Sequence, residues 1–181
     1  TSTTTKTKQK PVRDALTFVV FNDAYETSFA GATINEPTRT YHTVQGRERV
    51  GLLIDPGAAA GLIGSDTLKD MIESSIRPAG REHLIQRRAS RQRVTGISGV
   101  PEPALQHISV PIGLKGINAT YEAAVIGGNG SRCPALLPNP SMIASRMALL
   151  TGFFNNRDGL LVVHNAQGRR LLYRALLTDS G

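Results

Sequence analysis

Asp55 is the residue whose surroundings in this sequence point most directly to chemistry. It follows the apolar run 50–54 (Val-Gly-Leu-Leu-Ile), which is typical of a buried strand. Burying a carboxylate is costly unless hydrogen bonds or a partner charge compensate. Gly57 follows two residues later, where the absence of a Cβ allows close approach of the backbone. This pattern predicts a functional carboxylate on a tight loop.

The chemistry that suits such a loop is hydrolysis by paired carboxylates. Two carboxylates about 3 Å apart share one proton, so that one activates a water while the other polarises the bond to be cleaved. The second Asp-x-Gly of the chain, at 179–181, is interpreted as a polar tail, with the start of a second lobe as the alternative. With one usable Asp-x-Gly, the partner carboxylate is expected from a second copy of the chain in a two-fold homodimer.

The elements that must position Asp55 are expected to be short strands. The 181 residues include 18 Gly and 10 Pro, and 40% are hydrophobic, which favours strands and turns over long helices. Strands are predicted at 16–21, 41–44, 49–54, 58–63, 94–100, 108–114, 119–126 and 135–137, and a closing hairpin at 160–164 and 170–177. Two helices are predicted, one at 66–72 with Ser65 as its N-cap and one capped by Asn139, with Pro140 first, running to Leu150.

The order of these elements resembles that of the retropepsin-like aspartic proteases. Residues 53–58 (Leu-Ile-Asp-Pro-Gly-Ala) resemble the family's apolar-apolar-Asp-Thr/Ser-Gly-Ala motif, and 61–63 match the short strand that follows it. Residues 95–100 (Thr-Gly-Ile-Ser-Gly-Val) look like the glycine-rich flap. Two strands after the flap, and then residues 136–138 leading into a helix, complete the series, which covers roughly residues 41 to 150.

The resemblance implies a mostly β, closed-barrel acid protease fold with a short helix after the last core strand, in a homodimer. It implies an aspartic endopeptidase that cleaves a peptide or polyprotein, most like the protease segment of long-terminal-repeat retrotransposon polyproteins. The site residues that it implies are Asp55 as the catalytic carboxylate, Pro56, Gly57 and Ala58 in the catalytic loop, and Gly96, Ile97, Ser98 and Gly99 in the flap.

Two prolines depart from the family pattern. Pro56 stands where the family has Thr or Ser, whose hydroxyl links the two catalytic loops across the dimer axis, and proline has neither a hydroxyl nor an N–H. Pro138 stands where the family has a glycine beneath the catalytic loop. The alternative is therefore a weak or inactive retropepsin-fold module that serves as a structural or binding subunit of a larger assembly.

The domain organisation is read from composition. Residues 1–15 are predicted to be a disordered basic tail because they are polar and low in complexity. Residues 16–40 are interpreted as an N-terminal extension, 41–177 as the retropepsin-like domain and 178–181 as a tail.

The basic charge of the chain is compatible with a nucleic-acid partner. The net charge is +7, and six arginines lie between Arg77 and Arg93. Such a segment can bind phosphates, but it lacks the interleaved aromatic residues that stack on bases. A solvated loop is the favoured interpretation.

No metal or cofactor is expected. The four histidines, His42, His83, His107 and His164, are too far apart in sequence for a zinc motif, and the single cysteine, Cys133, is interpreted as a small buried hydrophobe. No apolar stretch approaches the ~20 residues of a membrane span. No signal peptide opens the sequence, so an intracellular location is favoured, although the compartment is left open.

Overall fold

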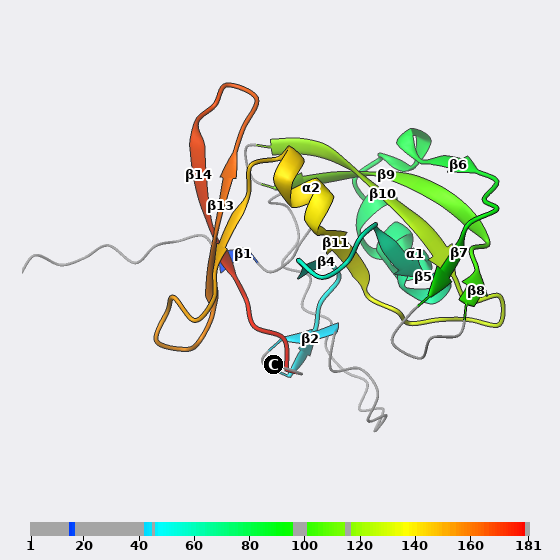
Figure 1. Ribbon diagram of the computed structural model, residues 1–181, viewed down its shortest axis with the longest axis horizontal. Helices are drawn as coiled ribbons and strands as arrows, with labels where there is room; N and C mark the ends of the chain where they lie inside the picture. The colour runs from blue at the N-terminus through cyan, green and yellow to red at the C-terminus, as the bar shows by residue number, and fades with distance from the viewer. Residues whose placement is uncertain (1–14, 17–41, 45, 96–100, 115–116, 180–181) are drawn as a thin grey trace, which may run out of the picture.

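The computed structural model describes residues 15–16, 42–44, 46–95, 101–114 and 117–179 (Figure 1). Strands are the main regular secondary structure of the described part and helices are few, which confirms the predicted mostly β class. Most of the strand predicted at 16–21 and the tip of the predicted flap, 96–100, lie outside the described residues.

The larger sheet has six strands in the order β4-β11-β5-β10-β9-β6. The bounds of these strands are β4 Leu52–Asp55, β5 Leu62–Gly64, β6 Gln86–Arg88, β9 Gln106–Leu114, β10 Ile117–Ile126 and β11 Ala135–Pro138. Strand β11 is parallel to β4 on one side and antiparallel to β5 on the other. The connection from β4 to β5, which begins with Pro56 directly after Asp55, therefore passes over the end of an inserted third strand.

The smaller sheet has four strands in the order β1-β14-β13-β12. Their bounds are β1 Ala15–Leu16, β12 Ala148–Leu150, β13 Gly159–His164 and β14 Arg170–Ala175. The remaining strands of the described residues form two small hairpins, one of β2 Thr43–Val44 and β3 Arg47–Glu48, the other of β7 Arg93–Thr95 and β8 Pro101–Pro103. The closed barrel that the resemblance implied is not found among the described residues.

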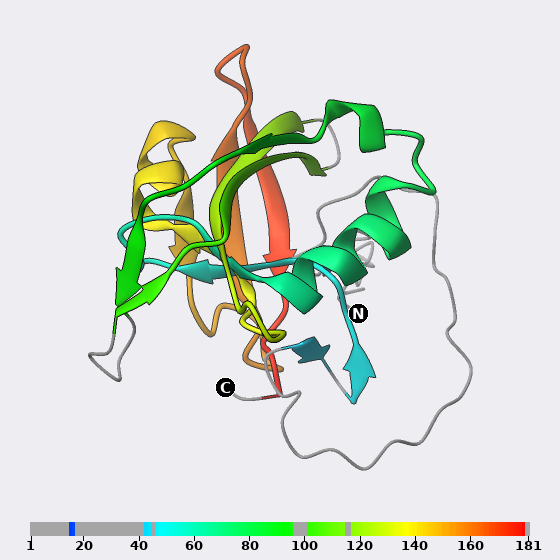
Figure 2. The same cartoon turned by 90° about the vertical axis from the view of Figure 1, so that its right-hand side faces the viewer.

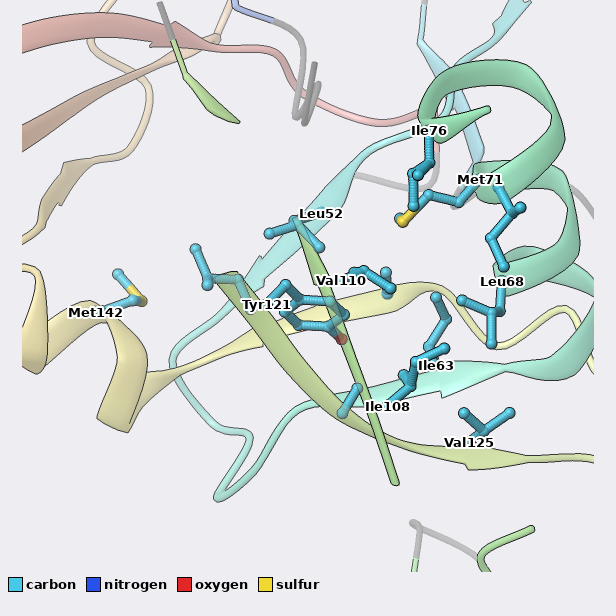
Figure 3. Close-up of a cluster of buried hydrophobic side chains, with 14 residues drawn as sticks. Leu52, Ile63, Leu68, Met71, Ile76, Ile108, Val110, Tyr121, Val125 and Met142 are labelled. Atoms are coloured by element: carbon cyan, nitrogen blue, oxygen red, sulfur yellow. The ribbon is translucent and has the colours of Figure 1, made fainter. Parts of the chain in front are cut away.

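Between Leu52 and Leu150, in the described residues, four helical segments connect the strands. They are α1 Ser65–Met71, a π-helical continuation Ile72–Ile76, a 3-10 turn Glu82–Leu84 and α2 Asn139–Ala144. Helix α1 and its continuation bury Leu68, Met71 and Ile76 against the six-stranded sheet (Figure 3).

The main core lies on one face of the six-stranded sheet. Ile108 and Val110 are fully buried in this core, but Ser109 and Pro111 are buried as well, so the alternation predicted for residues 108–114 does not appear as alternating burial. The hairpin predicted between 108–114 and 119–126 is confirmed by the antiparallel register of β9 and β10. A second, smaller cluster of Leu161, Val163, Tyr173 and Ala175 lies on the four-stranded sheet.

Several predicted boundaries are wrong. Residues 58–63 were predicted as one strand, but the strand begins only at Leu62, because residues 56–61 form the turn after β4. Residues 49–51 are not strand, and Arg47–Glu48 form β3 of a hairpin instead. The arginine-rich segment, interpreted as loop, contains β6, which pairs with β9.

Both predicted N-caps are wrong. Ser65 lies inside α1, and its hydroxyl donates to Gly127 O at 2.8 Å and accepts from Ser131 N at 3.1 Å, so it anchors a neighbouring loop. Helix α2 begins at Asn139 with Pro138 in the cap position and no side-chain cap hydrogen bond.

The second predicted helix also ends too late. Helix α2 ends at Ala144, and residues 148–150 form strand β12. Arg146 takes a left-handed backbone conformation, φ 47°, which stops the helix. The next residues alternate, with Leu149 packed against the core and its two neighbours exposed, as in a half-buried strand.

Candidate active site

Asp55 is the last residue of β4 and is half-buried. Its Oδ1 accepts a hydrogen bond from Gly57 N at 2.9 Å, and its backbone carbonyl accepts one from Ala58 N at 3.1 Å. The two bonds close a tight turn around the carboxylate. The other carboxylate oxygen, Oδ2, has no hydrogen-bond partner among the residues that the structure describes, so it is available to a proton, a water or a substrate group.

Gly57 makes this turn possible. A Cβ at this position would lie 3.2 Å from Asp55 Oδ1, which is tighter than nine in ten real Cβ contacts. A side chain at this position would therefore push the Asp55 carboxylate back by a few tenths of an ångström. Pro56, between them, is exposed and offers no N–H to the turn.

Strand β11 supports the turn from beneath. Pro138, which is buried, lies opposite Asp55 in the parallel register of β11 and β4. The next residue, Asn139, donates its backbone N–H to Ala58 O at 3.2 Å. Helix α2 is therefore tied at its first residue to the loop that carries Asp55.

Tyr121 is a supporting residue that the sequence analysis missed. Its hydroxyl lies 2.8 Å from Leu62 O and 3.0 Å from Leu136 O, so its single proton can be donated to a carbonyl of either strand beside the loop. The side chain is buried, and burial raises the pKa of its phenol well above the ordinary range. The available signal was a tyrosine among small residues on a predicted core strand, because a buried tyrosine hydroxyl generally finds a partner.

Two segments around Asp55 contain no charged residue, and we call their surface the uncharged strip. They are residues 56–65 and 133–145. The exposed members of the strip are Pro56, Gly57, Ala59, Ala60, Asn139, Pro140, Ile143 and Ala144. Ile143, on α2, leaves 69% of its surface exposed, the largest fraction among the exposed large hydrophobic residues of the described chain.

Strands β7 and β8 flank the segment predicted as a flap, whose tip lies outside the described residues. Strands β7 and β8 pair from Arg93 opposite Pro103 to Thr95 opposite Pro101. Gly96, Ile97, Ser98 and Gly99 lie outside the described residues. The β7–β8 hairpin, the loop after β4 and helix α2 all lie toward the left in Figure 2, whereas Figure 1 shows the hairpin well to the right of β4 and α2.

The other candidate residues do not gather into a site. Arg77 pairs with Glu82 at 2.8 Å and Arg88 lies 3.7 Å from Glu122, both at the surface. No group of three His, Cys, Asp or Glu side chains that could hold a metal is found among the described residues. Cys133 is partly buried, and burial raises the pKa of its thiol to about 11, so it is a poor nucleophile at neutral pH.

The comparison with known proteins gives no family model, no curated protein and no solved structure that matches this chain. No helix in the described part of the chain is long and apolar enough to cross a membrane.

Proposed function

We propose that this chain is an aspartic endopeptidase of the retropepsin type, which cleaves a peptide or a polyprotein with two Asp55 carboxylates from two copies of the chain. The observation that carries the proposal is the setting of Asp55. A half-buried carboxylate ends a core strand on a turn closed by Gly57, and a third strand is inserted between the two strands that the turn connects. The sequence resemblance to retrotransposon proteases supports the same assignment.

The chemistry follows from two carboxylates that share one proton. The ionised carboxylate takes a proton from a water, whose oxygen attacks the carbonyl carbon of the scissile peptide. The protonated carboxylate gives its proton to the carbonyl oxygen, which produces a tetrahedral diol. The C–N bond then breaks as the amide nitrogen receives a proton and the carbonyl re-forms.

A second copy is required because one chain offers a single suitable carboxylate. Two copies each carry a net charge of +7 and repel one another on average. The uncharged strip beside Asp55 adds no charge of its own to this repulsion. Its small residues, Gly57, Ala59 and Ala60 among them, also let two backbones approach closely.

The proposal is tested with Asp55→Asn, which keeps the shape of the side chain and removes its charge. Cleavage of a mixed peptide library at mildly acidic pH is expected to fall by at least ~10²-fold, because both members of the pair lose their acid–base group. Asp66→Asn, the same change in α1, is the matched control and is expected to cleave like the parent. Undiminished cleavage by Asp55→Asn would remove this residue from the mechanism.

Pro56 favours a second candidate function, an inactive module of the same fold that serves as a structural or binding subunit. Pro56 gives neither a hydroxyl nor an N–H to its copy's loop, and a typical net hydrogen bond is worth about 0.5–1.5 kcal/mol, so a few kcal/mol of contact between the loops are missing. Pro56→Thr is expected to tighten the dimer and to raise cleavage. A dimer without cleavage in both proteins would favour the inactive module.

A further inference from the structure

Four arginines lie together along one edge of the six-stranded sheet. They are Arg87, Arg88, Arg91 and Arg93, and we call the surface that they form the arginine edge. Strand β6, which contains the first two, pairs with β9 on one side, and no described strand pairs with its other side. The chain continues from β6 to β7 along the right-hand rim of Figure 1, and all four arginines are exposed. Their charge therefore faces solvent along one continuous stretch of chain.

The arginine edge holds most of the net charge of the protein. Residues 83–101 contain these four arginines and no Asp or Glu, so they contribute +4 of the net +7. Residues 1–82 contain ten basic and ten acidic residues and contribute no net charge. Positive charge that is concentrated in one stretch, instead of spread over the whole surface, attracts a polyanion.

Two acidic residues next to β6 neutralise part of this charge. Glu122 on β10 lies 3.7 Å from Arg88, and both side chains are more than half exposed, so solvent screens the pair. Glu82 lies close enough to attract Arg87, but it accepts two hydrogen bonds from Arg77, at 2.8 and 3.1 Å. The guanidinium groups of Arg87 and Arg88 therefore keep most of their N–H donors for another partner.

The second half of the arginine edge is equally open. Arg93 donates one hydrogen bond to Pro101 O at 3.2 Å, and the side chain of Arg91 forms no hydrogen bond or ion pair within the described residues. Glu102, on the paired strand β8, accepts a hydrogen bond from Gly127 N at 2.9 Å. Its carboxylate is thereby directed to the loop after β10 and away from the arginines.

The arginine edge presents charge on both faces of the sheet. Arg87 lies opposite Ile108 and Arg88 opposite His107 in the register of β6 and β9. Successive side chains of a strand point to opposite faces, so these two arginines flank the edge on its two sides. A nucleic-acid duplex has a row of phosphates on each side of its grooves, and the major groove of B-DNA admits a two-stranded β-ribbon. A sheet edge with arginines on both faces can therefore reach both rows.

Two other polyanions fit this edge less well. Proteins that bind single strands generally stack the bases on aromatic side chains, and residues 77–95 contain no Phe, Tyr or Trp. An acidic peptide that extended the sheet would need a run of backbone hydrogen bonds. Strand β6 has three residues, Gln86–Arg88, and two of them are charged, which is a common protection of an edge against a further strand.

We propose that the arginine edge binds the phosphate backbone of a nucleic-acid duplex. Strand β6 lies at the opposite end of the strand order from β4, which carries Asp55. A duplex on this edge therefore leaves the candidate active site open to a peptide. The inference goes beyond the proposed protease function and does not depend on it, because no part of the binding uses the carboxylate of Asp55.

The test measures binding of the whole chain to DNA and RNA duplexes of about 20 base pairs by fluorescence anisotropy. Four phosphate contacts predict that affinity falls about 10²-fold between 50 and 200 mM salt, since each contact contributes about 0.9 to the slope of log K against log salt. Arg87→Gln/Arg88→Gln should weaken binding at least tenfold at the lower salt and reduce the slope by about 2. Arg91→Gln/Arg93→Gln should act in the same direction.

Two further variants control for net charge. Arg169→Gln/Arg170→Gln removes the same charge from two exposed neighbouring arginines at the start of β14, and it should bind within about twofold of the parent. Glu122→Gln removes the carboxylate beside Arg88 and should tighten binding about threefold, because one competing negative charge is lost. Asp55→Asn should bind like the parent.

Each outcome decides the proposal. Loss of binding confined to the two double variants of the arginine edge supports it, and the relative affinities of the DNA and RNA duplexes then identify the source of the phosphates. Binding that these variants leave unchanged, or that Arg169→Gln/Arg170→Gln weakens as strongly, would overturn it. A polyglutamate peptide that binds more tightly than either duplex would also overturn it, in favour of an acidic peptide. Cleavage of peptide, present or absent, leaves all these results as they are.

Discussion

The two sheets of this protein are held together in different ways. The six-stranded sheet covers a cluster of 14 buried residues, almost all aliphatic or alanine, with Tyr121 as its one aromatic side chain (Figure 3). The four-stranded sheet has four buried hydrophobic residues in its cluster. It also has a buried carboxylate, Asp158, which leaves 3% of its surface exposed.

Asp158 organises a polar network at one end of the smaller sheet. Its Oδ2 accepts hydrogen bonds from Arg174 Nε at 2.7 Å and Asn156 Nδ2 at 2.7 Å, and its Oδ1 accepts one from Leu177 N at 3.0 Å. The guanidinium of Arg174 also lies 4.6 Å from the centre of the Phe154 ring. Burial raises the pKa of Asp158, but these hydrogen bonds together outweigh it and hold the pKa below its ordinary value.

The contrast between an apolar core and a buried polar network predicts which sheet each kind of substitution should destabilise. Apolar burial depends little on pH or salt and is lost when side-chain volume is removed. A buried, paired carboxylate depends on its ionisation and on every one of its donors. Volume changes should therefore damage the six-stranded sheet, and pH or charge changes should damage the four-stranded one.

The largest effect is expected from Ile63→Ala on β5. Ile63 is fully buried in the larger cluster, so removal of its side chain leaves a cavity and should lower the free energy of unfolding by about 2–5 kcal/mol. Urea denaturation followed by circular dichroism measures the change. Leu172→Ala, at an exposed position, should change the same quantity by about 0.5 kcal/mol or less.

Asp158→Asn should have the next largest effect. The amide keeps the shape but cannot accept the charge-assisted bonds in the same way, so Arg174 loses its partner and the free energy of unfolding should fall by about 1–3 kcal/mol. Asp70→Asn breaks the more exposed pair with Arg132 and should cost only about 0–1 kcal/mol. Equal losses in both variants would contradict the contrast between the sheets.

The loss of stability at acid pH should also depend on the carboxylate of Asp158. Because the pKa of Asp158 is lower in the folded than in the unfolded chain, its contribution to stability is fully present above the unfolded value of 3.8 and is lost as pH falls through the folded pKa. Denaturation midpoints measured between neutral pH and pH 3 should fall less in Asp158→Asn than in the parent. Parallel curves of midpoint against pH for the two proteins would show that another titrating group causes most of the loss of stability in acid.

A smaller loss is expected from Phe154→Leu. This change keeps most of the apolar volume and removes the aromatic face beneath Arg174, so the free energy of unfolding should fall by about 0.5–1 kcal/mol. In the Asp158→Asn background, Phe154→Leu should cause a different loss of unfolding free energy from the one it causes in the parent, because both residues act on the guanidinium of Arg174. Strict additivity would contradict a shared network.

The smallest effect is expected at the surface pair of Arg77 and Glu82. Both side chains are about half exposed and their contact is screened by solvent. Glu82→Gln should leave the urea midpoint unchanged within error at both low and high salt. A clear loss would show that the arginine-rich segment contributes more to the fold than its exposure indicates.

The core strands were predictable because their side chains alternate or form continuous apolar runs. Ile108, Val110 and the register of β9 with β10 follow from that periodicity. Strand β12 was mistaken for helix because a short apolar segment such as 148–150 suits either structure, and the left-handed turn at Arg146 has no signal in the sequence. The partners of Ser65 and Asn139 come from distant segments, which local capping rules do not include.

The sequence predicted where in the chain the candidate site lies, but not which distant residues surround it. The apolar run, Asp55 and Gly57 indicate a tight turn, and the structure contains one. The resemblance put Pro138 beneath the loop, but the pairing of β11 with both β4 and β5, the bond from Asn139 to Ala58 and the role of Tyr121 depend on pairings between residues far apart in sequence. Those pairings follow from tertiary packing, which a single sequence does not reveal.

The inserted position of β11 has a consequence for the order in which the chain folds. Residues 52–64 cannot complete their part of the sheet until β11, about 80 residues later, has been synthesised and has entered between β4 and β5. During translation the Asp55 turn therefore lacks the support of β11 until most of the domain has been synthesised. Such non-local closure predicts slow folding, and it means that no N-terminal fragment ending before residue 135 should hold the Asp55 turn in its native geometry.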